Sequence, residues 1–317
     1  MLSVIIPALN EQNYIGECID ALINLELNNV EIEIIVVDNG SEDKTVDIAE
    51  KYGVNIFVKK DGNISGLRNW GVLHSKGDIL AFIDADCVVF RDWFINAMKC
   101  MADQSADAVG SFHVIPGDAG WIGKTAELIQ IKKVGANVSY IPSGNLLIKR
   151  AAFEAICGFD ETLETDEDVE LCHRLKKNGY QLFLDPEIKC THLGYPKNII
   201  GMFKRELWHG KNSWTVFIQD LLKVRNLKVV LYSALNFILL LAIAYGGYRF
   251  LFFAENKVLI LSIFFYLILN AFVAFLDWQK IKGNYSSIFF YVLIYGTARA
   301  LSVIKCLFAN AYRLKKR

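Results

Sequence analysis

Short runs of consecutive apolar residues recur through the first part of the chain, and polar residues follow each run. Because the runs are continuously apolar rather than alternating, they predict strands that are buried on both faces of a parallel sheet. The four predicted strands cover residues 3–7, 33–38, 54–59 and 78–84. Apolar residues at helical spacing predict helices between them, over residues 17–27, 41–52 and 65–75. This alternation predicts a doubly wound α/β sheet with its ligand site at the carboxyl ends of the strands.

The pattern is weaker in the middle of the chain. Residues 102–142 show no sustained period, and we expect extra edge strands there, with a loop-helix segment over the substrate side. Residues 149–179 return to helical spacing, and a break is predicted at 157–160. The second half of the first domain is therefore expected to be less regular than the first half.

The composition is ordinary up to about residue 220, and from Val229 onward apolar and aromatic residues dominate. Residues 229–253 and 258–278 are both mostly apolar, and roughly 20 such residues are enough to cross a bilayer. The short link at 254–257 makes them an antiparallel hairpin. Helices that are apolar on every face are rarely soluble. We therefore expect a cytosolic domain over residues 1–222 and a membrane region over residues 223–317.

Basic residues near the apolar stretches predict their orientation. Those at the two outer ends of the hairpin are Lys223, Arg225, Lys228, Lys280 and Lys282. By the positive-inside rule, these ends and the first domain face the cytosol of a multi-pass protein in the cell membrane. A third apolar stretch, 288–309, precedes four cations that a full span would place on the far side. This favours an interfacial or re-entrant helix over the alternative of a third span.

Charge and cysteine content narrow the classes of function. The formal net charge is zero, so no basic field indicates nucleic acid, and an anionic substrate must be held by a few placed cations. The seven cysteines are odd in number and never form Cys-x-x-Cys. We therefore expect reduced thiols in a cytosolic domain and no zinc site. The apolar run at the N-terminus is short and broken by Pro7, unlike a signal peptide.

Two aspartates follow the fourth predicted strand. Asp84 and Asp86 lie two residues apart at its carboxyl end, where both carboxylates can turn toward one ligand. Two such oxygen donors suit a hard divalent cation, Mg²⁺ or Mn²⁺, which neutralises a diphosphate. His192 follows another apolar run and is a candidate for a further metal ligand as a neutral imidazole. Each of these residues alone is equally compatible with a structural role.

Six ordered blocks of sequence resemble family 2 glycosyltransferases of the GT-A fold, from residue 2 to about residue 195. The blocks are SVIIPALNE (3–11), VVDNGSEDKT (36–45), GLRNWGV (66–72), FIDADC (82–87), SGNLLIKR (143–150) and CGFDETLETDEDVELCHRL (157–175). Each block is weak alone, but all six in this order are specific. The resemblance implies a Rossmann-like, mostly parallel sheet flanked by helices. It also implies transfer of a sugar from a nucleotide-diphosphate sugar.

The resemblance assigns several residues to the donor site. The residues implied to line the nucleotide pocket are Pro7, Asn10, Glu11 and Asp38. Carboxylates at such positions accept hydrogen bonds from the base or the ribose. Arg68 resembles the family's cation beside the diphosphate, where a guanidinium fits phosphate oxygens. Asp86 is implied to be the more consistent metal ligand, with Asp84 nearer the ribose or the sugar.

The resemblance also assigns a catalytic base and an acceptor site. The segment Thr165-Asp-Glu-Asp168 resembles the family's acidic pair at the start of a helix. It implies that Asp168 removes the proton of the acceptor hydroxyl and that Glu167 orients the acceptor. Acids in the first turn of a helix also stabilise it without doing chemistry. The residues assigned to the acceptor site are Ser143, Gly144, Asn145, Arg205 and Trp208.

We expect transfer to a hydroxyl of a lipid-linked or membrane-proximal acceptor. Three other functions remain as alternatives. A polyprenyl-phosphate glycosyltransferase of the dolichol-phosphate-sugar synthase type fits the same resemblance. A phosphate acceptor is already ionised and needs no base, so the acidic segment at 165–168 favours a hydroxyl acceptor. A catalytically silent membrane scaffold would bind no nucleotide with a divalent cation. A sugar nucleotidyltransferase would carry a Gly-rich, Arg-containing loop after the first strand, which the sequence lacks.

Overall fold

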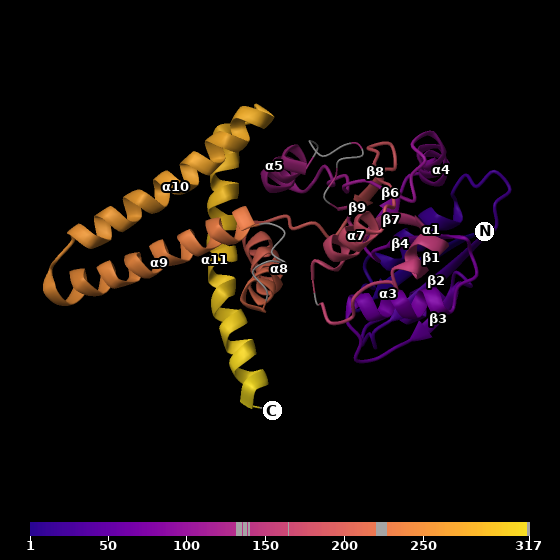
Figure 1. The fold of residues 1–317 in the computed structure, drawn as a ribbon, viewed down its shortest axis with the longest axis horizontal. Coiled ribbons are helices and arrows are strands. Elements are labelled where there is room, and N and C mark those ends of the chain that lie inside the picture. Colours follow the sequence, from indigo (N-terminus) through magenta and orange to yellow (C-terminus); the bar gives the residue numbers. More distant parts are fainter. Residues whose placement is uncertain (131–134, 136–137, 139, 164, 220–226, 316–317) are drawn as a thin grey trace. The chain divides into compact units, whose positions relative to one another are not determined.

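The computed structural model describes residues 1–130, 135, 138, 140–163, 165–219 and 227–315 (Figure 1). The chain forms two compact units. The first unit combines Met1–Pro116 with Gln130–Tyr195, and the second combines Gly117–Ile129 with Pro196–Arg317. The domain boundary expected at residues 222 and 223 lies outside the described residues, as do Lys223 and Arg225.

A seven-stranded sheet forms the centre of the first unit, in the order β3-β2-β1-β4-β7-β6-β8. Strands β3, β2, β1 and β4 are parallel neighbours, whereas β7 runs antiparallel to β4 and β6. Their bounds are Leu2–Ala8 (β1), Ile32–Asp38 (β2), Asn55–Val58 (β3), Ile79–Ile83 (β4), Ala108–Gly110 (β6), Asn145–Lys149 (β7) and Leu182–Leu184 (β8). The mostly parallel α/β sheet predicted from the sequence is confirmed, and its four expected strands are β1 to β4.

Helices cover both faces of this sheet. They are α1 (Ile15–Ile23), α2 (Thr45–Glu50), α3 (Ile64–Leu73), α4 (Trp93–Asp103), α6 (Arg150–Ala155) and α7 (Glu167–Lys177). Val4 and Ile6 of β1 belong to the core cluster that holds Ile15 of α1. Ile5, between them, belongs to the cluster that holds Leu67 of α3. Both faces of the central strands are therefore dry, which explains their continuously apolar sequences.

The helical stretch predicted over residues 149–179 is two helices, α6 and α7. The predicted break at 157–160 is confirmed, and the connection continues as far as α7. Cys157, Gly158 and Asp166 adopt left-handed backbone, with φ of 62°, 69° and 63°. Such residues end one helix and redirect the chain before the next. Within residues 102–142 the described residues form β6 and the helix α5 (Gly120–Gln130), which groups with the second unit. β6 is not the expected edge strand, because it lies between β7 and β8.

A small two-stranded sheet lies beside the carboxyl end of β4. It pairs β5 (Cys87–Val89) with β9 (Cys190–His192) in antiparallel fashion, with Cys87 opposite His192. The N–H group of Leu193 donates to the carbonyl oxygen of Asp86 at 2.8 Å. These backbone hydrogen bonds hold the residues that follow β4 against β9, close to the last residues of the first unit.

The second unit is helical. Besides α5 it contains α8 (Ile199–Gln219), α9 (Leu227–Phe253), α10 (Lys257–Ile281) and α11 (Tyr285–Lys315). Three stretches are long and apolar enough to cross a membrane: Val230–Phe253, Lys257–Ile281 and Tyr285–Ile304. Large apolar side chains cover their outer surface, and those of Leu251 and Phe252 are 77% and 70% exposed. The two helices of the expected hairpin are present, and α11 is a third continuous helix.

Polar side chains inside the second unit bond to one another. Asn270 of α10 is fully buried, accepts a hydrogen bond from Tyr232 of α9 at 2.5 Å, and donates to Asn236 at 3.0 Å. Arg299 of α11 pairs with Glu206 of α8 at 3.0 Å. Packing of α8 against α11 explains why the units divide at residues 195 and 196 rather than near residue 222. Assignment of residues 1–222 to one cytosolic domain stays a prediction.

Candidate active site

Polar loops follow β1, β2 and β4 at one edge of the sheet, because parallel neighbours end on the same side. Asp38, the last residue of β2, is buried and accepts N–H bonds from Gly40 and Ser41, each at 2.8 Å. The loop after β1 is tied to the loop after β2. There, Asn10, with φ of 57°, donates from its backbone N–H to the Ser41 hydroxyl at 2.8 Å. The two loops therefore form one fixed wall, with Pro7 buried in β1 behind it.

Three carboxylates gather at this edge. Glu11 is held by a backbone hydrogen bond to the Thr45 hydroxyl at 2.7 Å. Burial, together with the charges of Asp86 and Asp84, raises the pKa of Glu11 to about 7. Burial and the Asp84 charge likewise raise the pKa of Asp86 to about 6. Like charges crowded in this way are relieved by a cation placed among them.

Asp86 and His192 come together as expected for two ligands of one metal ion. The Nδ1 atom of His192 lies 3.5 Å from Oδ2 of Asp86. The ligand atoms of Asp86, His192 and Cys87 all lie within 4.8 Å of one another. Gly194 stands directly beside them, since a Cβ atom there would lie 2.1 Å from Oδ2 of Asp86. Oxygen and imidazole donors in this arrangement fit a divalent cation.

Asp84 is paired with a buried arginine. The guanidinium of Arg68 is only 1% exposed and bonds Asp84 at 2.7 Å and Glu167 at 2.8 Å. Glu167 also accepts a hydrogen bond from the Ser143 hydroxyl at 3.0 Å. Burial acts to raise the pKa of Asp84, but the Arg68 charge outweighs it and the pKa is lowered. The resulting chain of charges links the end of β4 to the start of α7.

Asp168 lies in the first turn of α7, next to this chain of charges. Its carboxylate accepts the N–H of Val169 at 2.7 Å. Burial, followed by the charges of Glu167 and Asp166, raises the pKa of Asp168 well above its usual value. A carboxyl group with a raised pKa is a stronger base once it is ionised. Asp168 is therefore the candidate base of this site.

The residues assigned to the acceptor site fall in different places. Asn145 is fully buried, donates to the Ser111 hydroxyl and to the Ile188 carbonyl, both at 2.9 Å, and accepts from Trp93 at 2.8 Å. Its amide is thus bonded within the core. Gly144 lies against Asp84, because a Cβ atom there would be 2.3 Å from Oδ2 of Asp84. Arg205 and Trp208 belong to α8 in the second unit.

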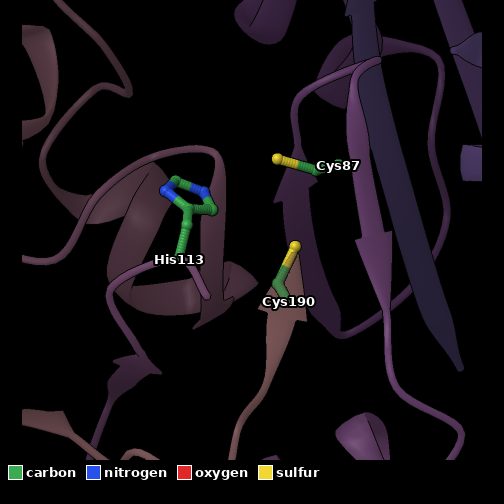
Figure 2. Close-up of side chains that lie close together, drawn as sticks. All are labelled: Cys87, His113 and Cys190. Atoms are coloured by element: carbon green, nitrogen blue, oxygen red, sulfur yellow. The ribbon is translucent and has the colours of Figure 1, made fainter. Parts of the chain in front are cut away.

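One residue of this region, His113, was not predicted from the sequence. Its ring faces that of His192, with 5.2 Å between the ring centroids. Burial lowers the pKa of His113, but the neighbouring Cys87 and Asp84 outweigh it and raise the pKa to about 9. Cys87 and Cys190 lie beside the same ring (Figure 2). No pattern marked His113, because it lies in the irregular stretch after β6.

The fold and the acidic site define a glycosyltransferase of the GT-A type. The family description "Glycosyl transferase family 2" matches residues 3–157. Residues 3–157 therefore form a family 2 glycosyltransferase domain, as the resemblance implied.

Relatives and a solved structure agree with this family. The glycosyltransferase AglE of Haloferax volcanii is 28% identical over 236 residues, covering 71% of this chain and 76% of its own. The probable glycosyltransferase YdaM of Bacillus subtilis is 30% identical over 205 residues, and the match spans about half of that relative, at 58% and 49% of the two chains. The mannosyltransferase PcManGT of Pyrobaculum calidifontis has a similar fold, with a TM-score of 0.60 at 17% identity, covering 96% and 86% of the two chains.

Proposed function

We propose that this protein transfers a sugar from a nucleotide-diphosphate sugar, with inversion, to a hydroxyl of a lipid-linked or other membrane-proximal acceptor. The observation that carries the proposal is the meeting of Glu11, Asp84, Asp86 and His192 at one sheet edge, near Asp168. PcManGT was solved with GDP-mannose and Mn²⁺. That complex supports a nucleotide sugar and a divalent cation as the classes of ligand here.

The donor side follows from the crowded carboxylates. Asp86, with Asp84 and His192, would hold Mg²⁺ or Mn²⁺, and the cation when bound would neutralise the diphosphate that leaves. The residues that would line the nucleotide pocket are Pro7, Asn10, Glu11 and Asp38. Arg68 already neutralises Asp84 and Glu167. It therefore acts on the donor mainly by fixing those two carboxylates.

The acceptor side depends on Asp168. Its carboxylate would take the proton of the acceptor hydroxyl while that oxygen attacks the anomeric carbon. The new bond joins the acceptor oxygen to that carbon, and the bond to the diphosphate oxygen breaks on the opposite face. Ser143 and Gly144 lie between Asp84 and Glu167 and are the acceptor-site candidates of the first unit. Arg205 and Trp208 belong to α8 of the second unit, and their part in acceptor binding stays a prediction.

The apolar helices support a multi-pass membrane protein with the catalytic unit on the cytosolic side. Helix α11 runs without interruption through 31 residues, which favours a third span over a re-entrant segment. Arg299 within it is paired with Glu206, so this charge is compensated. A reporter fused to the C-terminus tests the assignment, because a third span places it outside and an interfacial helix leaves it in the cytosol.

A donor screen tests the proposal most directly. The full chain in detergent is mixed with UDP-, GDP- and dTDP-sugars, and Mn²⁺-dependent hydrolysis and thermal stabilisation are measured. We expect a response to one nucleotide class, and its loss in Asp86→Ala. Asp92→Ala is the matched control, since Asp92 is exposed and makes no capping hydrogen bond at α4. An unchanged response in Asp86→Ala would remove the metal assignment, and no response in any mixture would favour the silent scaffold.

The acceptor class is tested separately. Polyprenyl phosphate and a lipid-linked glycan are offered as alternative acceptors to the wild type and to Asp168→Asn. A hydroxyl acceptor predicts that the variant fails with the glycan. Full turnover of Asp168→Asn with polyprenyl phosphate would instead assign the protein to the phosphate-acceptor class, because that acceptor needs no base.

A further inference from the structure

Two thiols and an imidazole converge behind the carboxylates of the active site. Cys87 comes from β5, Cys190 from β9, and His113 from the segment after β6. Their ligand atoms lie within 4.8 Å of one another, with both cysteines buried and the histidine partly buried. Figure 2 shows the three side chains turned toward a common centre. Three segments far apart in sequence thus bring three metal-binding side chains close together.

Backbone hydrogen bonds fix the three segments against each other. Cys87 pairs with His192 in the β5–β9 ladder, and Val89 pairs with Cys190. The N–H of Val114 donates to the Cys190 carbonyl at 2.8 Å, and the His192 N–H donates to the Val114 carbonyl at 3.1 Å. The neighbours of all three groups are therefore bonded to one another. Such an arrangement holds ligands in place before an ion arrives.

Nε2 of His113 is buried and has no hydrogen-bond partner among the described residues. A metal ion can bind an imidazole nitrogen and displace the protons of the two thiols. Zn²⁺ ligands in a tetrahedral site lie about 3.5–3.8 Å apart. The three groups, which lie within 4.8 Å of one another, therefore need to close by no more than about 1 Å.

We propose that Cys87, Cys190 and His113 form a zinc site with three protein ligands and an open fourth position. Thiolate donors select a soft or borderline ion and disfavour Mg²⁺ and Mn²⁺. The site therefore differs in metal preference from the adjacent one at Asp86 and His192, although Cys87 lies within 4.8 Å of the ligand atoms of both. The zinc site itself is independent of the proposed transferase chemistry. Asp86 precedes Cys87 directly, and His192 follows Cys190 by two residues. If the proposed function holds, zinc therefore fixes the position of both donor-site ligands.

Metal content tests the zinc site without reference to activity. The full chain is purified in detergent from zinc-supplemented medium, and its zinc is measured by elemental analysis. We expect a stoichiometric amount in the wild type, and its loss in Cys87→Ser and in Cys190→Ser. Cys100→Ser is the matched control, because Cys100 is also buried but lies on α4. Asp86→Ala should keep its zinc while losing the response to Mn²⁺, which separates the two sites.

Cobalt provides a second measurement that does not need a variant. Wild-type protein loaded with Co²⁺ should show the near-ultraviolet charge-transfer band of thiolate ligation. Absence of both zinc and this band would overturn the proposal. So would a disulfide between Cys87 and Cys190, detected by mass spectrometry of the unreduced protein.

Manganese activation tests separately whether zinc fixes the positions of Asp86 and His192. After zinc is removed and Mn²⁺ alone is returned, the concentration of Mn²⁺ needed for half activation should rise about tenfold or more, as when supporting ligand contacts are lost. The turnover number at saturating Mn²⁺ should change much less. Unchanged Mn²⁺ activation in zinc-free enzyme would refute the positioning role, and the metal-content result would still decide the site.

Discussion

A charged network is buried in the first unit, and a neutral one is buried between α9 and α10 of the second unit, which also holds the ion pair of Glu206 with Arg299. In the first unit, Arg68 lies between Asp84 and Glu167, and all three meet at the candidate active site. In the second unit, Asn270 joins Tyr232 and Asn236 through hydroxyl and amide groups alone. The charged network surrounds the place where ionic substrates would bind, whereas the neutral one lies between apolar helices.

The difference follows from the cost of burying charge. A buried ion pair is stable only while both partners remain, because either one alone is a desolvated charge. Amides and hydroxyls bond across helices at lower cost in a membrane. Loss of one partner should therefore cost more in the charged network around Arg68 than in the neutral network between α9 and α10.

Removal of the carboxylate beside the charged network should give the largest effect. Asp168→Asn keeps the size of the side chain but cannot accept the proton of the acceptor hydroxyl. We expect turnover to fall by about 10²–10⁴-fold, the usual contribution of a general base. Single-turnover transfer assays measure the loss, and an unchanged melting temperature shows that the fold is intact.

The pH profile of the wild type checks the same assignment. Burial, Glu167 and Asp166 raise the pKa of Asp168. The base works only when ionised, so kcat/KM should fall as the pH drops through this raised pKa, above the ordinary range of an aspartate. The residual activity of Asp168→Asn should lack this acidic limb. A limb in the ordinary carboxyl range would contradict the role of Asp168.

Breaking the charged network itself should chiefly affect stability. Arg68→Met leaves Asp84 and Glu167 unpaired in a buried site, and we expect a loss of about 3–5 kcal/mol in the free energy of unfolding. Denaturant titration of the purified chain measures it. Arg91→Met is the control, because Arg91 is 78% exposed and its pair with Glu26 should contribute almost nothing. Partial recovery in Arg68→Met/Asp84→Asn would show that the unpaired charge causes the loss.

Breaking the neutral network should have the smallest effect. Asn270→Leu removes the hydrogen bonds to Tyr232 and Asn236, and we expect a loss of about 1 kcal/mol in the helical unit. Unfolding in detergent micelles measures it, with Phe272→Leu on the exposed face of α10 as the control. A loss as large as that of Arg68→Met would show that charge does not distinguish the two networks.

The strongly patterned part of the fold was predictable from the sequence. Strands β1, β2 and β4 are continuously apolar and buried on both faces, so local composition was enough to find them. Strand β7 was not foreseen as an antiparallel insertion, because its five residues, Asn145–Lys149, carry no signal of direction. Strands β6 and β8 have three residues each and depend on their neighbours rather than on their own sequence.

The candidate site was predictable only in part, for a similar reason. Asp84 and Asp86 were found because they follow a clear strand, and His192 because it follows an apolar run. The pairing of Arg68 with Asp84 depends on how α3 packs on the sheet, which residue spacing does not encode. The cluster at Cys87 was invisible, since His113 and Cys190 reach it through tertiary pairing and not through a spaced motif.

Two glycines set a boundary on how such an enzyme can evolve. Gly144 and Gly194 leave bare main chain against the carboxylates of Asp84 and Asp86, where even a methyl group would collide. A side chain at either position would force a carboxylate of the candidate site to move. New sugar or acceptor preferences must arise in the surrounding loops, so chemistry can stay constant while substrate range diversifies.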